Sequence, residues 1–347
     1  MSFTTLTAAD FVVSSDSITA PAWSTNNPTL STFFTASSGV NYSYYIDVYN
    51  TGSNLINSAI QFSIAYGHIY GSGSAPINSL VPQNTPTRIL FGEYRNIVFG
   101  DSETNFNFGT GNTASLDLIA LQVDRNRYKE SLFPGTFNLQ MRNGSGETIK
   151  LTDNSKDVST ITYVDGGRIY NIVSGSNGSA ASSPLISGAV AKGYTPSGSY
   201  GLFLPDIGLI VLNPKALACP TGSSGGGLNI SLNGNPTYAA STENLTAIFA
   251  AIQSGSSFQL NSQETISSNY IFVRVPNSGY NYSTNPSFTS GSSGELIYSN
   301  FINSPQTYPT AVGLYNTNNE LLAVAKLSKP LAKDFTKEAL VRVKLDW

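Results

Sequence analysis

The stretch Ile60-Gln61-Phe62-Ser63-Ile64-Ala65-Tyr66 alternates large apolar residues with smaller or polar ones. Successive side chains of a β-strand point to opposite faces of a sheet, so a period of two places the four large apolar residues on one face. The stretch therefore predicts a β-strand with one buried face.

The same period of two recurs from one end of the chain to the other. It predicts further strands at residues 40–49, 270–275, 321–327 and 339–347, and an aliphatic run predicts another at 209–212. In the segment 339–347 one face collects Val341, Val343, Leu345 and Trp347. Because such a face invites aggregation when exposed, we expect it to be buried in a sheet or against a neighbouring subunit.

Helical periodicity is rare in this chain. Residues 242–253 follow the i, i+3, i+4, i+7 spacing of an amphipathic helix through Leu245, Ile248, Phe249 and Ile252. A shorter helix is expected at 124–131, ended by Pro134 and Gly135. The expected fold class is mainly β, with antiparallel, sandwich-like sheets and one or two short helices.

The length of 347 residues exceeds the usual size of a single hydrophobic core. We expect an extended amino-terminal arm over residues 1–35, in which Pro21 and Pro28 interrupt any long strand. A β domain should cover residues 36–214, because the clearest break follows the aliphatic run. A second β-rich domain should cover residues 215–347 and contain the helix near 242–253.

The composition excludes several classes of partner. Charged residues make up 11% of the chain, against about 25% in an average soluble domain. The net charge is -3, and the Lys and Arg residues do not gather into a basic stripe. Nucleic acid and membranes are therefore not expected partners. Cys219 is the only cysteine and no secretory signal is recognisable at the amino terminus. Both features predict folding in a reducing cytoplasm.

Three features could be taken for parts of a catalytic site. Gly222-Ser223-Ser224-Gly225-Gly226 matches the string of a nucleophile elbow, but the residues that follow alternate like a strand instead of forming a helix. His68, the only histidine, falls at a strand end before Gly71, where a hydrogen-bonded rim position is expected. Cys219 has no catalytic motif around it. We therefore expect no catalytic residues and no enzymatic activity.

Oxygen ligands gather in two short segments, Asp101-Ser102-Glu103 and Asp153-Asn154-Ser155-Lys156-Asp157. Neither segment has the spacing of a Ca²⁺ loop, so turn formation by Asp and Asn is the favoured interpretation. One histidine and one cysteine cannot supply a characteristic transition-metal site, and no glycine-rich phosphate motif occurs. No metal and no cofactor are expected.

The chain contains 19 tyrosines, of which Tyr280 and Tyr282 stand close together in a loop. Exposed tyrosines stack on sugars or anchor protein interfaces, whereas tyrosines in strands pack within the sheet. Both interpretations stay open for the loop pair.

Two blocks of the chain resemble a known family. The first block comprises residues 68–74 (HIYGSGS), 92–96 (GEYRN), 124–129 (DRNRYK) and 132–135 (LFPG), and the second comprises residues 269–276, 280–286, 312–316 and 321–327. These segments resemble virion structural proteins of contractile-tailed bacteriophages, particularly those of cyanophage type. The resemblance carries no catalytic residues.

The resemblance implies a structural subunit of a phage tail, baseplate or neck. Such a subunit acts through contacts with other virion proteins and with copies of itself, and resides in the virion after folding in the host cytoplasm. An alternative is a carbohydrate-binding or host-receptor recognition module that contacts a surface glycan through loops rich in Tyr and Asn. A cell-wall or polysaccharide hydrolase is a third hypothesis, for which the sequence pairs no two carboxylates.

Overall fold

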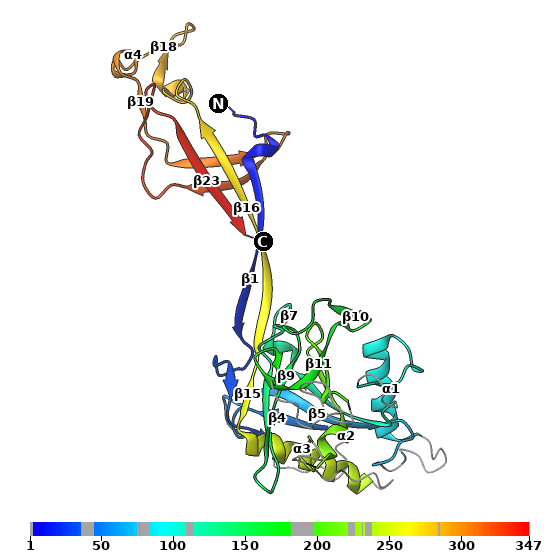
Figure 1. The fold of residues 1–347 in the computed structure, drawn as a ribbon. Helices are drawn as coiled ribbons and strands as arrows, with labels where there is room; N and C mark the ends of the chain where they lie inside the picture. The colour runs from blue at the N-terminus through cyan, green and yellow to red at the C-terminus, as the bar shows by residue number, and fades with distance from the viewer. Residues whose placement is uncertain are drawn as a thin grey trace. The chain divides into compact units, whose positions relative to one another are not determined.

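The computed structural model describes residues 3–35, 45–74, 76, 84–108, 114–181, 198–220, 226–230, 232, 238–283 and 285–346. The chain forms two compact units. Unit 1 comprises Met1–Ser17 and Thr265–Trp347, and unit 2 comprises Ile18–Glu264. Unit 2 is therefore inserted between two segments of unit 1. The chain passes between the units within strands β1 (Phe11–Pro21) and β16 (Asn261–Val275), which are neighbours in one sheet (Figure 1).

Unit 2 is built on a sheet of 13 strands. The strands are β2 (Thr29–Leu30), β3 (Phe34–Thr35), β4 (Tyr45–Tyr49), β5 (Ile60–His68), β6 (Asp117–Val123), β8 (Asn138–Arg142), β9 (Thr148–Asp153), β10 (Thr162–Val164), β11 (Gly167–Ser176), β12 (Ser179–Ala180), β13 (Gly201–Leu204), β14 (Leu209–Leu212) and β15 (Ser257–Gln259). Their order along the sheet is β2-β15-β8-β9-β11-β13-β14-β6-β5-β4-β3, and β10 and β12 each pair with β11. Neighbouring strands pair antiparallel.

The two ends of this strand order lie close together in the sequence, because β2 ends at Leu30 and β3 begins at Phe34. The sheet therefore curls so that its two halves face each other. Phe62 of β5 meets Phe258 of β15 with ring centroids 5.3 Å apart, and the Trp23 indole N–H donates to the Phe258 carbonyl oxygen at 2.8 Å. The prediction of a mainly β fold with antiparallel, sandwich-like sheets is confirmed.

Both faces of the central strands are buried. Ile210 and Leu212 of β14 belong to the larger cluster of core residues, whereas Leu209 and Val211 belong to a second cluster that includes Phe91. Because neighbouring side chains in a strand alternate between faces, a strand covered on both sides needs apolar residues at every position. This requirement explains the uninterrupted aliphatic run at 209–212.

Helix α3 (Tyr238–Gly255) confirms the helix predicted at 242–253 and extends it at both ends. Its side chains Leu245, Ile248 and Ile252 are buried in the larger core cluster, where α3 lies against β8 and β5. The 3.6-residue period of the sequence is thus the period of the buried face.

Helix α1 (Pro86–Phe99) is not predicted by the apolar pattern, and it covers β5 from the second core cluster. Its ends carry recognisable signals: Pro86 is the first helical residue, and Gly100 adopts the left-handed conformation with its N–H donating to the Asn96 carbonyl. The short helix α2 (Pro214–Ala218) also begins with proline, after Asn213.

The helix predicted at 124–131 is wrong. The segment forms only a 3-10 turn, η2 (Arg125–Arg127), because the Asp124 carboxylate accepts the backbone N–H of Asn126. The chain then enters β7 (Ser131–Leu132), which pairs with the first part of β16. Local capping and sheet pairing therefore override the apparent helical pattern.

Unit 1 is built around the antiparallel ladder of β16 and β23 (Ala339–Asp346), in which Ile271 stands opposite Val343. Three two-stranded pairs surround it: β17 (Thr289–Ser290) with β18 (Glu295–Leu296), β19 (Gln306–Thr307) with β22 (Lys333–Asp334), and β20 (Ala311–Tyr315) with β21 (Leu321–Lys326). Short helices are η1 (Ala8–Asp10), η3 (Pro286–Phe288) and α4 (Asn300–Asn303). The strands predicted at 270–275, 321–327 and 339–347 are present, and Trp347 lies outside the described residues.

The strand predicted at 40–49 corresponds to β4, which begins at Tyr45; residues 36–44 lie outside the described ranges. The boundaries of the two units differ from those expected at residues 35 and 214. β1 is an 11-residue strand, and the segment after it contributes the buried Trp23 to unit 2, so residues 1–35 are not a single arm. α3 and β15 share one core with strands that precede residue 214, so no boundary falls there.

Phe62→Ala should lower the free energy of unfolding of unit 2 by about 3–5 kcal/mol, because the ring is fully buried and its cavity cannot collapse completely. Urea unfolding followed by tryptophan fluorescence measures this loss, since the Trp23 ring lies 6.2 Å from the Phe62 ring. Ile56→Ala is the control, because Ile56 is fully exposed and should change the stability by less than about 0.5 kcal/mol. Equal losses in both variants would contradict this assignment of the core.

Candidate functional site

His68 is the last residue of β5, at the strand end expected from the sequence. Its Nδ1 accepts the backbone N–H of Tyr70 at 3.1 Å and that of Ser72 at 3.4 Å. In the neutral ring the proton is therefore on Nε2. The imidazole holds the turn at Gly71 through these two hydrogen bonds.

Asp117 faces His68 across the β5–β6 ladder, and Tyr66 interacts with the same carboxyl group. Burial raises the pKa of Asp117, an effect that the charges of His68 and Lys215 reduce. Burial lowers the pKa of His68, which Asp117 partly opposes, and burial raises the pKa of Tyr66 with a further contribution from Asp117. Each of the three groups is thus shifted toward its neutral form.

Asp117→Asn should stabilise the protein at neutral pH. The pKa of this carboxyl group is higher in the folded chain than in the unfolded chain, so the folded state becomes less stable as the pH rises through the two pKa values. Asparagine does not titrate, so the variant avoids this loss. The melting temperature of the variant should therefore exceed that of the wild type at about pH 7, with the gain shrinking toward about pH 4. Glu103→Gln, at an exposed carboxylate, is the control. A gain of equal size at both pH values would contradict the effect of burial.

The two segments rich in oxygen ligands form turns, as expected. The Asp101 carboxylate accepts the backbone N–H groups of Glu103 and Thr104 at 2.7 and 2.6 Å. The buried Asp153 carboxylate accepts the N–H of Gly135 at 2.9 Å and that of Ser155 at 3.2 Å. Within the described ranges, no group of three or more His, Cys, Asp or Glu side chains is placed to hold a metal ion.

Cys219 ends helix α2, and its backbone carbonyl accepts the N–H of Asn229. The string Gly222-Ser223-Ser224-Gly225-Gly226 falls almost wholly within residues 221–225, which lie outside the described residues. The tyrosines at 42, 44 and 194 also lie outside them.

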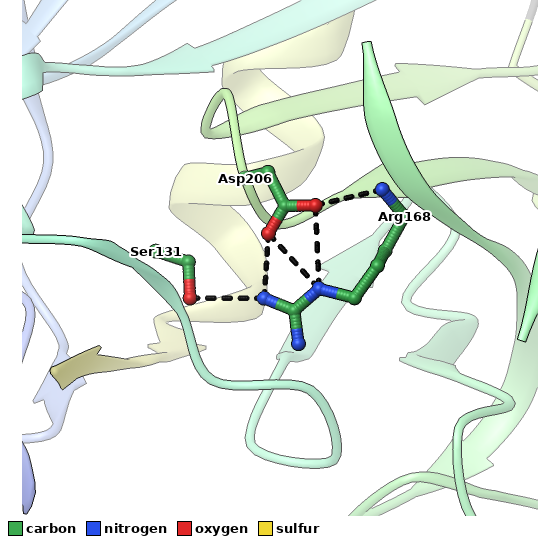
Figure 2. A network of polar contacts seen from close by, with 3 residues as sticks. All are labelled: Ser131, Arg168 and Asp206. Carbon is green, nitrogen blue, oxygen red and sulfur yellow. Dashed lines mark hydrogen bonds and ion pairs between the residues drawn. The ribbon is translucent and has the colours of Figure 1, made fainter. Parts of the chain in front are cut away.

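Arg168, Asp206 and Ser131 form a polar network that the sequence does not single out (Figure 2). The Arg168 guanidinium donates to both carboxylate oxygens of Asp206, at 2.5 Å from Nη2 to Oδ1 and at 3.2 Å from Nε to Oδ2, and to the Ser131 hydroxyl at 3.0 Å. The backbone N–H of Arg168 donates to Asp206 Oδ2 at 2.7 Å. Burial acts to raise the pKa of Asp206, but the hydrogen bonds and charge of Arg168 outweigh it and lower the pKa.

Asp206 also lines an open depression of about 470 Å³ together with Ser63, Gln122, Asp124, Arg125 and Tyr128. Several polar side chains of this depression are held by hydrogen bonds within the protein. Ser63 donates to Asp47 at 2.5 Å, Gln122 donates to the Ile207 carbonyl at 2.8 Å, and Arg125 donates to the Tyr128 carbonyl at 2.5 Å. The Gln122 contact fixes the turn between β13 and β14 against β6, the Ser63 contact joins β5 to β4, and the Arg125 contact holds the turn at η2.

Arg168→Ala should lower the free energy of unfolding by about 1–3 kcal/mol, because it leaves the Asp206 carboxylate without its charged donor. Arg168 and Asp206 expose 23% and 32% of their side chains, so water does not fully replace the lost contacts. Lys129→Ala is the matched control, since the ion pair of Lys129 with Glu264 is more exposed and should contribute less than about 1 kcal/mol. Chemical denaturation measures the free energy of unfolding of both variants. Equal losses would contradict a larger contribution of the Arg168 network to stability.

The loop tyrosines differ in their surroundings. The Tyr280 hydroxyl is hydrogen-bonded to Thr4 at 2.8 Å, and the Tyr280 carbonyl accepts the Thr307 hydroxyl. Tyr282 exposes 54% of its surface. Between them, Asn281 is buried and its Oδ1 accepts the Lys333 ammonium at 2.8 Å. Tyr280 therefore fixes its loop, and Tyr282 is the ring that is exposed for contact.

Unit 1 exposes many more large apolar residues for its length than unit 2 does. Of the 28 exposed large apolar residues among those described, 16 lie in unit 1, although unit 2 is more than twice as long. Only Ile271 and Val343 are buried apolar residues in the described part of unit 1. The 16 exposed residues are Phe3, Phe11, Val12, Val13, Tyr280, Tyr282, Ile297, Tyr298, Ile302, Tyr308, Tyr315, Leu321, Leu322, Val324, Phe335 and Leu340.

The exposed residues on and beside the β20–β21 hairpin form one patch, which we call the hairpin surface: Phe3, Tyr315, Leu321, Leu322 and Val324. The Phe3 and Tyr315 rings meet edge to face at 5.2 Å. Tyr315 and Leu321 extend over Gly313, the residue that pairs with Val324. The opposite face of the hairpin, with Val312 and Ala323, is half-buried. The strand at 321–327 was predicted from the sequence, but the exposure of one of its apolar faces was not.

A buried lysine links two segments of unit 1 by hydrogen bonds. The Lys333 side chain is fully buried, and its ammonium donates to three oxygens: the Asn277 carbonyl at 3.0 Å, Asn281 Oδ1 at 2.8 Å and the Asp334 carbonyl at 2.8 Å. A lysine ammonium has three donors, so this cation is saturated. It ties the loop before β17 to strand β22.

No family model matches this chain, and no match is found among the curated proteins or the solved structures. In the described part of the chain, no helix has the length and apolar character needed to cross a bilayer.

Proposed function

We propose that this chain is a structural subunit of a tailed-bacteriophage particle, located in the tail, baseplate or neck. It acts by contacts with neighbouring virion proteins and with copies of itself. The resemblance to virion structural proteins supports this proposal, and the segments that carry it are 68–74, 92–96, 124–129, 132–135, 269–276, 280–286, 312–316 and 321–327.

The observation that carries the proposal is the shortage of buried apolar residues in unit 1. A domain of about 100 residues normally has its own hydrophobic core. Unit 1 buries only Ile271 and Val343 among its described apolar residues and leaves 16 large ones exposed. Interfaces of obligate complexes resemble a domain core cut in half, so a unit of this kind is expected to gain its core from neighbouring subunits.

The polar groups of unit 2 support the same proposal. His68 accepts two backbone N–H groups, Asp101 holds a turn, and Asp206 is bound by Arg168. Each of these groups fixes a turn or loop by hydrogen bonds, which is the role of polar residues in a rigid scaffold.

Mass spectrometry of purified phage particles should detect this chain as a stoichiometric component. A variant that lacks residues 339–347 should be missing from particles, because it loses β23 and exposes Ile271. Unit 2 should remain folded in that variant, as judged by the fluorescence of the buried Trp23.

His68→Ala is the control, since the imidazole of His68 lies at a strand end in unit 2 and should leave incorporation near normal. The proposal fails if intact particles lack the wild-type chain, or if the truncated variant enters them as well as the wild type does.

A further inference from the structure

We infer that unit 1 is completed by unit 1 of a second copy of this chain, and that the hairpin surfaces of the two copies pack against each other. This inference deepens the proposed function and rests on it, because it names the partner and the residues of one subunit contact.

The hairpin surface has the properties of an interface centre. Leu321, Leu322 and Val324 expose 52%, 68% and 61% of their surfaces, and the Tyr315 ring lies beside them. A register shift after Leu314 places both Leu321 and Leu322 outside. A two-stranded hairpin is at best marginally stable in water, so it needs a cover over its second apolar face.

Unit 1 as a whole exposes about as much aromatic surface as one partner of a standard interface buries, and Phe3 and Tyr315 belong to the hairpin surface. Eight of its exposed residues are aromatic and show about half of their surface. At about 150–250 Å² per aromatic side chain, they offer on the order of 800 Å² together. Each partner in a protein interface of standard size contributes about 800 Å².

The charge of unit 1 favours a copy of itself over a partner of opposite charge. Its segments 1–17 and 265–347 contain seven Lys and Arg residues and seven Asp and Glu residues, so the formal charges sum to zero, whereas unit 2 carries the net charge of -3. Two such units do not repel each other, and neither attracts a highly charged partner. A two-fold, isologous contact, which is the commonest among soluble oligomers, places the same apolar patch of each copy against the other.

Sedimentation velocity of the full chain tests this inference. The wild type should sediment as a dimer or higher oligomer, and the double variant Leu322→Ser with Val324→Ser should raise the dissociation constant at least about 100-fold. Each lost apolar contact is worth roughly tenfold or more. Both side chains are exposed within the single copy, so circular dichroism should stay unchanged.

The matched control is Leu55→Ser with Ile56→Ser, two equally exposed aliphatic residues in a turn of unit 2. This control should keep the wild-type association. The inference is overturned if the wild type is monomeric at all concentrations, or if both double variants associate alike.

A gain-of-contact measurement covers the case in which the double variant fails to fold. In a Cys219→Ser background, Leu322→Cys should form a disulfide-linked dimer under mild oxidation, whereas Ile56→Cys should not. Equal cross-linking of the two would overturn the inference. A chain that is present in particles but monomeric in solution would overturn it while leaving the proposed function standing. A chain that forms oligomers in solution but is missing from particles would overturn the proposed function and leave this inference standing.

Discussion

The antiparallel ladder between β16 and β23 is the interaction on which unit 1 depends. It pairs eight residues of each strand, from Ser268 with Asp346 to Val275 with Ala339. It also places Ile271 and Val343, the two buried apolar residues described in unit 1, opposite each other. Polar contacts hold other parts of unit 1 in place: the ion pair of Asp10 with Arg274 attaches η1 to the ladder, and the buried ammonium of Lys333 ties the loop before β17 to β22. Hydrogen bonds of this kind fix geometry well but add little net stability.

Unit 2 is held together mainly by buried apolar side chains instead of polar contacts. Its curled sheet is covered on both faces, and aromatic residues from distant strands, including Trp23, Phe62 and Phe258, meet in the middle of one core. Its charged residues mostly anchor turns, as Arg168 does. The same chain thus contains one unit with a large apolar core and another with few buried and many exposed apolar residues.

Local pattern in the sequence predicts those parts of the fold that depend on neighbouring residues. The alternation at 60–66 and 339–347 and the helical period at 242–253 all correspond to elements of the structure. The amino-terminal segment was misjudged because the strand that pairs with β1 is β16, more than 200 residues away, and no local pattern reports such pairing. Helix α1 was missed because its evidence lies in its ends, Pro86 and Gly100, and its interior was not recognised as helical. The hairpin surface could be predicted only in part: residues 321–327 are apolar on both faces, but which face stays uncovered depends on the packing of unit 1.

The insertion of unit 2 between the two segments of unit 1 has a consequence for biosynthesis. The ribosome makes Met1–Ser17 before unit 2 and Thr265–Trp347 after it, so the strands of unit 1 cannot meet until all of unit 2 has been translated. Amino-terminal regions of a nascent chain generally fold before later ones, and unit 2 can form its core while the second segment of unit 1 is still being made. The exposed apolar residues of the β20–β21 hairpin leave the ribosome only after all of unit 2. Unit 2 can therefore bury its own apolar residues before those of the hairpin are available for contact.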